Sequence, residues 1–413
     1  MEDLLLLLGL LGVIIIIGFL GNVLFSRTRI PEALFLLIVG LIIGPVLSLI
    51  NTEPLKEISS FVATIALIMI LLEAGTSLDI RKLLRNFSHA TVFTLMVFIL
   101  STGFISLFLY LLMNWPLEHS LILGVISGGT TTITVMALAS RCSISEDAKN
   151  LLFLESIIND ITVISAAVIL IQIIKTGIVE LTKIGNLILA SISIAFLVGF
   201  LAGIVWIIIL FRYLEKHELN YVATLGIALI LYSFIESVGA SGAIAVLIFS
   251  LTVGNFRNVM MRFRIKTKLI TENSLETMKK IKSIQLAMTF FVKTFFFVFL
   301  GLIFSFKNLT DEILIIVSVI IIILLIARLF STEVLSHFDN RYKQDRFLIT
   351  TMLPRGLTAT VVAFLPEHAG IEIPSMIEIV LLMLLLSTIV AIIGAVIQER
   401  RFPCTEELKK SGS

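Results

Sequence analysis

The stretch LLFLESIINDITVISAAVILIQII, Leu151–Ile174, contains only two charged side chains, Glu155 and Asp160. A bilayer core of about 30 Å is crossed by about 20 apolar residues in a helix. Backbone polar groups in lipid must be satisfied within the segment, so this stretch is predicted to be a membrane-spanning helix. A charge near the bilayer centre costs about 2.5–3.5 kcal/mol on insertion scales, and two acids in one span therefore indicate a functional site.

Twelve further apolar stretches of similar character occur along the chain. The composition agrees, because 58% of the residues are hydrophobic and only 15% are charged, against about 45–50% and about 25% in soluble domains. We therefore predict an all-α polytopic membrane protein with about 13 transmembrane helices in a single transmembrane domain, residues 1–413. The other predicted spans are Leu4–Phe25, Ala33–Ile50, Ile58–Ala74, Ala90–Met113, Ser120–Ser140, Asn186–Phe211, Leu219–Ile235, Gly239–Gly254, Ile284–Phe306, Ile313–Leu335, Phe347–Leu365 and Met376–Ile397.

The lysines and arginines between the predicted spans lie mostly on one side of the membrane. Of the 31, 24 fall in the C-terminal tail or in loops after odd-numbered spans, the longest of which is Asn255–Ser283, and four fall on the opposite side. Cytoplasmic loops carry the excess of Lys and Arg, so we predict a multi-pass protein of the cell membrane with its N-terminus outside and its C-terminus in the cytoplasm. The net charge of +2 does not indicate a nucleic-acid partner.

Several ionisable side chains are predicted inside spans, where they need a partner or a water-filled cavity. Glu155 and Asn159 share one helix face, and Ser156 and Asp160 share the adjacent face. Carboxylate, amide and hydroxyl oxygens suit a hard cation, and a carboxylate also takes a proton. The alternative is a set of ion pairs that only stabilises helix packing, and the number of intramembrane charges argues against it. These charges are Glu73, Glu155, Asp160, Lys293, Arg328 and Arg355.

Two predicted spans contain residues that interrupt a helix. The fifth contains Gly128-Gly129 followed by threonines, which weaken a helix. The twelfth contains Pro354-Arg355-Gly356, and proline removes a backbone donor and clashes with the preceding turn. Broken helices in corresponding halves indicate the midplane site of a transporter. We therefore predict two inverted six-helix repeats over about 4–174 and 219–397, a connector helix over about 186–211, and a short cytoplasmic tail, 398–413.

Five segments, which span nearly the whole chain, carry a resemblance to a known family. They are Ile30–Glu32 with Gly40–Pro45, Glu155–Asp160, Ser241–Ala243 with Gly254-Asn255, Phe297–Gly301, and Pro354–Gly356. The sequence resembles monovalent cation:proton antiporter family 1, the archaeal NhaP-like sodium/proton antiporters of the cation–proton antiporter superfamily. In that family an Asn-Asp pair, here Asn159-Asp160, goes with electroneutral exchange. The chain departs from the family at the fifth span, where many relatives carry Thr-Asp-Pro and this chain carries Thr130-Thr131-Thr132.

The resemblance implies roles for individual residues. Asp160 would bind Na+ and H+ in turn, so Na+ is the expected metal at Asp160. Glu155 and Arg328 would form a structural ion pair that buttresses Asn159. The predicted ion-binding residues are Asp160, Ser156, Thr130, Glu73, Asn159 and Thr131. The residues expected at the helix breaks or in charge compensation are Gly128, Gly129, Pro354, Arg355, Gly356 and Lys293.

The predicted function is secondary active antiport by alternating access, not an enzymatic reaction. The chain would exchange a monovalent cation, Na+ or also Li+, for H+ with 1:1 electroneutral coupling. It would need no cofactor, since Na+ and H+ are substrates, and the resemblance implies a homodimer. The same spans also fit a K+/H+ antiporter or a sodium-coupled solute carrier. An ion channel fits less well, because a channel does not need two broken helices around a titratable acid.

Overall fold

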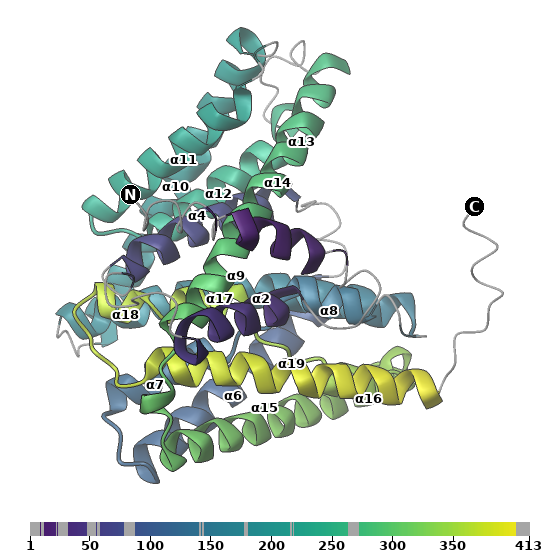
Figure 1. The fold of residues 1–413 in the computed structure, drawn as a ribbon. Helices are drawn as coiled ribbons and strands as arrows, with labels where there is room; N and C mark the ends of the chain where they lie inside the picture. Colours follow the sequence, from purple (N-terminus) through teal and green to yellow (C-terminus); the bar gives the residue numbers. More distant parts are fainter. Residues whose placement is uncertain are drawn as a thin grey trace. The chain divides into compact units, whose positions relative to one another are not determined.

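The computed structural model describes residues 9, 12–21, 23, 32–47, 55, 58–77, 87–139, 142, 144–176, 181–214, 217, 219–262 and 272–401. Within these ranges the chain forms helices and turns and contains no strand (Figure 1). The chain divides into two compact units. Unit 1 comprises Met1–Lys56, Asn86–Ala167 and Phe297–Ser413, and unit 2 comprises Glu57–Arg85 and Val168–Phe296.

Seven helices in the described ranges are long and apolar enough to cross a membrane. Each of them coincides with a predicted span, and the predicted class, an all-α polytopic membrane protein, is confirmed. They are α6 (Phe87–Leu111), α9 (Glu146–Thr176), α10 (Leu181–Tyr213), α11 (Asn220–Ser237), α14 (Glu272–Ile303), α15 (Asp311–Phe338) and α19 (Met376–Arg401).

The other predicted spans coincide with shorter or interrupted helices. Two spans are broken where the sequence predicts breaks: α7 (Leu117–Ser127) is followed by α8 (Thr132–Ala139), and α16 (Arg346–Thr351) by α17 (Leu357–Val362). The first span contains the helix Gly12–Gly21. The remaining elements are α2 (Glu32–Leu41), the π-helix η1 (Ile42–Val46), α4 (Ser59–Ser77), α12 (Gly242–Gly254), α13 (Phe256–Arg262), α18 (Leu365–His368) and the 3-10 helices η3 (Phe306–Asn308) and η4 (Asn340–Tyr342).

The predicted loop Asn255–Ser283 is wrong in its described parts, because α13 lies within it and α14 begins at Glu272. The axes of α12 and α13 differ by 81°. Hydropathy does not detect the polar N-terminal part of α14. This part carries the ion pair between Lys280 and Glu276, 3.0 Å apart and one helical turn from each other, which favours a helix in water.

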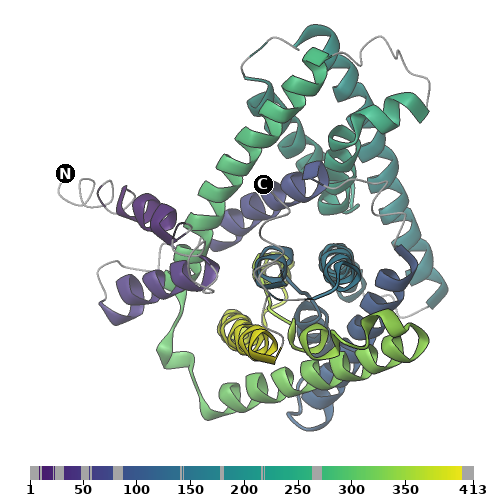
Figure 2. The same ribbon diagram turned by 90° about the vertical axis from the view of Figure 1, so that its right-hand side faces the viewer.

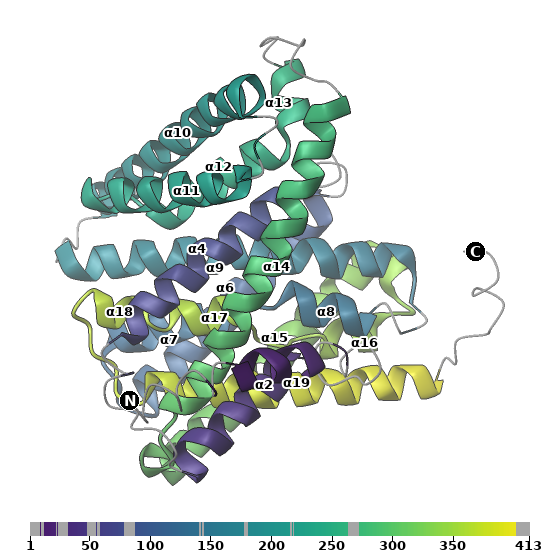
Figure 3. The same cartoon turned by 45° about the horizontal axis from the view of Figure 1, so that its top comes forward.

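In unit 2, α12 packs against α4, α10 and α11, and Figure 3 shows α10, α11 and α12 side by side. Most side chains of α12 are buried and apolar. Gly254 lies so close to Thr76 of α4 that an added Cβ would overlap its backbone. Small residues at such contacts let membrane helices approach closely, where packing and hydrogen bonds drive association.

In unit 1, α15 packs against α6, α16 and α19, and α19 also contacts α7, α8 and α17. In Figure 2, α19 is coloured yellow and viewed nearly along its axis. The two interrupted spans are therefore held in one unit by the same long helices. This arrangement brings residues from distant parts of the chain to the candidate site.

Candidate functional site

The interruptions of the fifth and twelfth spans lie against each other. Residues 128–131 separate α7 from α8, and residues 352–356 separate α16 from α17. The backbone N–H of Thr131 donates to the carbonyl of Pro354 over 3.0 Å. Gly356 has no side chain, and a Cβ there would overlap the side chain of Thr131. One backbone hydrogen bond and one close glycine contact therefore contribute to fixing the crossing.

Asn159 and Glu155 of α9 contact the first break. The amide Nδ2 of Asn159 donates to the carbonyl of Gly128 over 2.8 Å and to Oγ1 of Thr130 over 3.2 Å. Oγ1 of Thr130 in turn donates to Oε1 of Glu155 over 3.2 Å. Both α9 side chains are on one helix face, as their spacing of four predicts. Asn159 therefore binds a carbonyl exposed by the interruption, a group that must be satisfied when buried.

Glu155 and Arg328 form a two-pronged ion pair. Nη1 of Arg328 lies 2.7 Å from Oε1 of Glu155, and Nη2 lies 3.2 Å from Oε2. Both side chains are completely buried. Arg328 also donates from Nε and Nη2 to the carbonyl of Ile349, the residue three before Met352 where the second break begins. The ring of Phe93 lies 5.6 Å from the guanidinium. The sequence contains no signal for Ile349 or Phe93.

Asp160 and Ser156 lie one turn apart on α9, next to the Asn159–Glu155 face. Asp160 is partly exposed, whereas Glu155 is buried and paired with Arg328. Ser156 is buried, and its hydroxyl donates to the carbonyl of Phe153 over 2.9 Å. The Oδ1 atom of Asn159 is buried and accepts no hydrogen bond from the described residues. The face thus offers carboxylate, hydroxyl and amide oxygens, the ligand types that hard cations prefer.

Arg355 links the second break to the first. Its side chain is 1% exposed, and Nη1 donates to the carbonyl of Gly129. A cation beside the C-terminal end of α7 is favoured by the helix dipole. The backbone N–H of Arg355 donates to Oγ of Ser387 on α19 over 2.9 Å. Sequence reasoning missed Ser387, although a serine within the apolar span Met376–Ile397 is a signal that could have identified it.

The structure shows the neighbours of three further predicted site residues. The side chain of Thr131 lies against Gly356, so its close neighbour is the second break. Glu73 of α4 and Lys293 of α14 belong to unit 2 and form an ion pair of 2.5 Å, with both side chains partly buried. The sequence predicts a ligand role for Glu73 and charge compensation by Lys293, but not that the two pair with each other.

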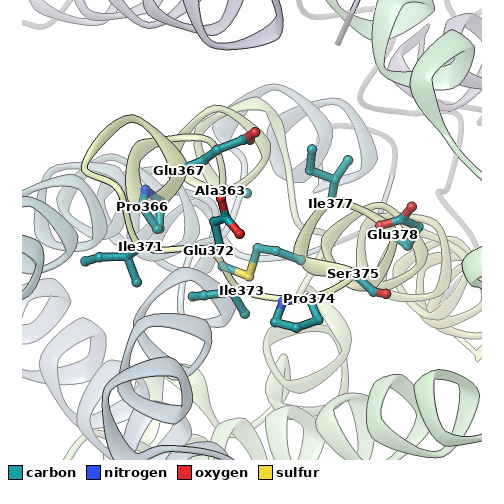
Figure 4. A pocket seen from close by; sticks show the side chains of 11 residues that line it. Ala363, Pro366, Glu367, Ile371, Glu372, Ile373, Pro374, Ser375, Ile377 and Glu378 are labelled. Atoms are coloured by element: carbon teal, nitrogen blue, oxygen red, sulfur yellow. The ribbon is translucent and has the colours of Figure 1, made fainter. Parts of the chain in front are cut away.

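A hollow of about 320 Å³ lies between α18 and the start of α19 (Figure 4). It is lined by three acids, but their carboxylates do not converge in Figure 4. One of them, Glu378, accepts a hydrogen bond of 2.7 Å from Nδ2 of Asn308. No group of three His, Cys, Asp or Glu side chains within the described ranges is arranged to hold a metal ion. This hollow is therefore not a candidate metal site. The acids are Glu367, Glu372 and Glu378.

Solved structures with the same fold are known. The structure of the sodium proton antiporter MjNhaP1 from Methanocaldococcus jannaschii at pH 8 superposes with a TM-score of 0.74 and 22% identity, covering 100% of both chains. A second structure of that antiporter, from an electron-microscopy map, gives a TM-score of 0.76 and 21% identity over 97% of this chain and 98% of the other. At these identities the likeness concerns the fold.

Sequence comparison defines the family. The chain is 28% identical over 271 residues to Na(+)/H(+) antiporter 1 of Methanocaldococcus jannaschii, and the match spans 61% of this chain and 61% of that relative's length. The family model described as "Sodium/hydrogen exchanger, transmembrane" matches residues 12–397, nearly the whole chain. The helix breaks and the α9 face lie within the matched range. The chain therefore belongs to the transmembrane sodium/hydrogen exchanger family.

Proposed function

We propose that this protein is a secondary active antiporter that exchanges Na+ for H+ across a membrane. The observation that carries the proposal is the junction of the two helix breaks with α9, where Asn159 and Glu155 contact the first break and Asp160 follows directly. Membership of the exchanger family and the name of the archaeal relative support the same activity.

Asp160 is the proposed shared carrier of the two substrates. The charge of Glu155 is already neutralised by Arg328. Asp160, on the adjacent face of α9, is partly exposed. An ionised acid within a membrane needs a compensating charge, so Asp160 would carry a cation or a proton through most of the cycle. Ser156 and Asn159 would supply further oxygens when Na+ is bound.

Alternating access would expose this carboxylate to each side in turn. The part of the chain that holds the two breaks would move as the site changes sides. One Na+ in exchange for one H+ makes transport independent of membrane potential. The excess of Lys and Arg after odd-numbered spans supports an external N-terminus and a cytoplasmic C-terminus. Family resemblance supports a homodimer.

The experiment measures Na+/H+ exchange by the full chain in proteoliposomes. A pH-sensitive dye trapped inside the vesicles reports the internal pH. Addition of Na+ is expected to dissipate an imposed proton gradient, and clamping the membrane potential with K+ and valinomycin should not change the rate. Asp160→Asn keeps the side-chain volume and removes the titratable charge, and it is expected to abolish exchange. Ser237→Ala is the matched control, because Ser237 is exposed on α11 in unit 2. The Ser237→Ala protein should exchange Na+ for H+ at the normal rate.

Substrate and alternative functions are tested in the same assay. Parallel additions of Li+ and K+ distinguish a Na+/H+ antiporter from a K+/H+ antiporter. A response to Na+ that requires an added solute would instead indicate a sodium-coupled carrier. Normal exchange by folded Asp160→Asn protein would remove Asp160 from the mechanism.

A further inference from the structure

A second hollow, of about 440 Å³, lies where α15 ends and α16 begins. It is separate from the crossing of the broken helices, and none of the predicted ion-binding residues lines it. Its lining combines basic, hydroxyl and aromatic side chains. The lining includes Phe330, Glu333, Ser336, Phe338, Lys343 and Arg346.

Three hydrogen-bond donors at this hollow have no acceptor among the described residues. Ser336 is 1% exposed, and its Oγ makes no hydrogen bond. Lys343 is exposed and forms no ion pair within the described part of the chain. Arg346 uses Nη1 for Glu333 at 2.9 Å and Nε for the carbonyl of Lys343, which leaves Nη2. A buried hydroxyl without a partner is costly and needs an explanation.

The charge of the hollow favours an anion. Arg346 neutralises Glu333, and Lys343 then leaves a net positive charge. The C-terminal end of α15 carries partial negative charge, which basic neighbours also compensate. That simpler explanation of the lysine and arginine accounts for neither the buried Ser336 hydroxyl nor the hollow beside it. A phosphate group accepts several hydrogen bonds at once and therefore suits a hollow lined by several donors.

The aromatic side chains identify the source of the phosphate. Phe330 is 57% exposed and Phe338 is 83% exposed, and both line the hollow. A soluble anion gains nothing from exposed aromatic rings, whereas the acyl chains of a lipid would cover them. The charge asymmetry of the loops places this end of α15 on the side rich in Lys and Arg, where anionic lipids attract basic side chains.

We propose that this hollow binds the phosphate headgroup of an anionic phospholipid from the cytoplasmic leaflet. Lys343 and Arg346 supply the charge, and Phe330 and Phe338 contact the acyl chains. The Ser336 hydroxyl donates a hydrogen bond after the entering headgroup displaces the atoms that cover it. The site would anchor the junction of α15 and α16. Beside the helix crossing, Arg328 of α15 donates a hydrogen bond to the carbonyl of Ile349 in α16.

The test measures binding of phosphatidylglycerol to the purified, delipidated full chain by native mass spectrometry and by thermal melting. Phosphatidylcholine and inorganic phosphate are the comparison ligands. Ser336→Ala and Lys343→Gln are each expected to weaken phosphatidylglycerol binding by about tenfold, equivalent to about 1.4 kcal/mol. Without lipid, Ser336→Ala should melt no lower than the unmodified chain, because it removes a buried hydroxyl that has no partner.

Two substitutions serve as matched controls. Ser331→Ala lies on the same helix, but the Ser331 hydroxyl donates to the carbonyl of Ala327 over 2.8 Å. Lys280→Gln removes an exposed lysine of unit 2 that pairs with Glu276. Both should bind phosphatidylglycerol like the unmodified chain. The proposal would be overturned if Ser336→Ala and Lys343→Gln bound phosphatidylglycerol as tightly as the unmodified chain. Binding of inorganic phosphate as tight as that of phosphatidylglycerol would overturn the lipid assignment.

Discussion

Replacing Glu155 with glutamine removes one charge of the buried pair and leaves Arg328 without its counter-ion. Arg328→Met produces the opposite defect, because the Glu155 carboxylate then keeps only the hydroxyl of Thr130 as a donor. Each single change is therefore expected to destabilise the protein strongly. The double variant contains no buried charge at this position, and we expect it to recover much of the lost stability.

The magnitude follows from the burial and geometry of the pair. Both side chains are 0% exposed, and two hydrogen bonds of 2.7 and 3.2 Å join them. Two unit charges about 4 Å apart interact by about 4 kcal/mol at an effective dielectric constant of about 20. Removing one partner of a buried pair typically costs about 3–5 kcal/mol. With an unfolding entropy of about 2.1 cal/mol/K per residue, a chain of 413 residues should lose about 3–6 °C in melting temperature.

The assay is thermal melting of the two single variants and the double variant in one detergent, with fluorescence-detected size exclusion to measure the folded fraction. Arg328→Met also removes the two hydrogen bonds to the carbonyl of Ile349. That loss occurs in the presence and absence of Glu155, so it cancels in the double-mutant cycle. The remaining coupling energy reports the ion pair and is expected to be about 3 kcal/mol.

Additive effects would contradict this reasoning. If the double variant melts at the temperature predicted by summing the two singles, within about 0.5 kcal/mol, then Glu155 and Arg328 do not interact energetically. A small effect of both single changes would show that water reaches the pair. In either case, the Asn159–Thr130–Glu155 contacts would need another source of rigidity.

Three further predictions concern the site, the crossing and the polar end of α15. If Na+ and H+ compete for Asp160, apparent Na+ affinity in proteoliposomes should fall about tenfold per pH unit below the pH at which the site is half-protonated; constant affinity would exclude competition. Gly356→Ala places a Cβ on the side chain of Thr131 and should cost about 1–3 kcal/mol; adding Thr131→Gly should restore the melting temperature if this overlap is the cause. Arg341 hydrogen-bonds Asp339 and holds the pKa of that carboxyl below its usual range. The stabilisation is present above the unfolded pKa of about 3.9 and is lost as pH falls through the lower folded pKa. Arg341→Gln should therefore remove at most about 1 kcal/mol at neutral pH and less at acidic pH, where the Asp339 carboxyl becomes protonated; an equal loss at both pH values would point to packing instead.

Much of the site could be predicted because its residues break rules that apply locally along the chain. Pro354 and Gly128-Gly129 interrupt helices wherever they occur within a long apolar span, and both breaks are confirmed. Glu155 and Arg328 stand out as charges in apolar surroundings, and the structure pairs them. By contrast, hydropathy carries no signal for the polar start of α14.

The sequence by itself determined the number of apolar spans, the two broken helices and the asymmetry of the basic loops. These properties depend on short windows of residues and on the cost of polar groups in lipid. Tertiary structure alone decided which groups satisfy the exposed backbone: Asn159 binds the carbonyl of Gly128, and Ser387 accepts the N–H of Arg355. It also paired Lys293 with Glu73, 220 residues away. Such partners depend on which helix faces pack together, and nothing in the local sequence specifies that.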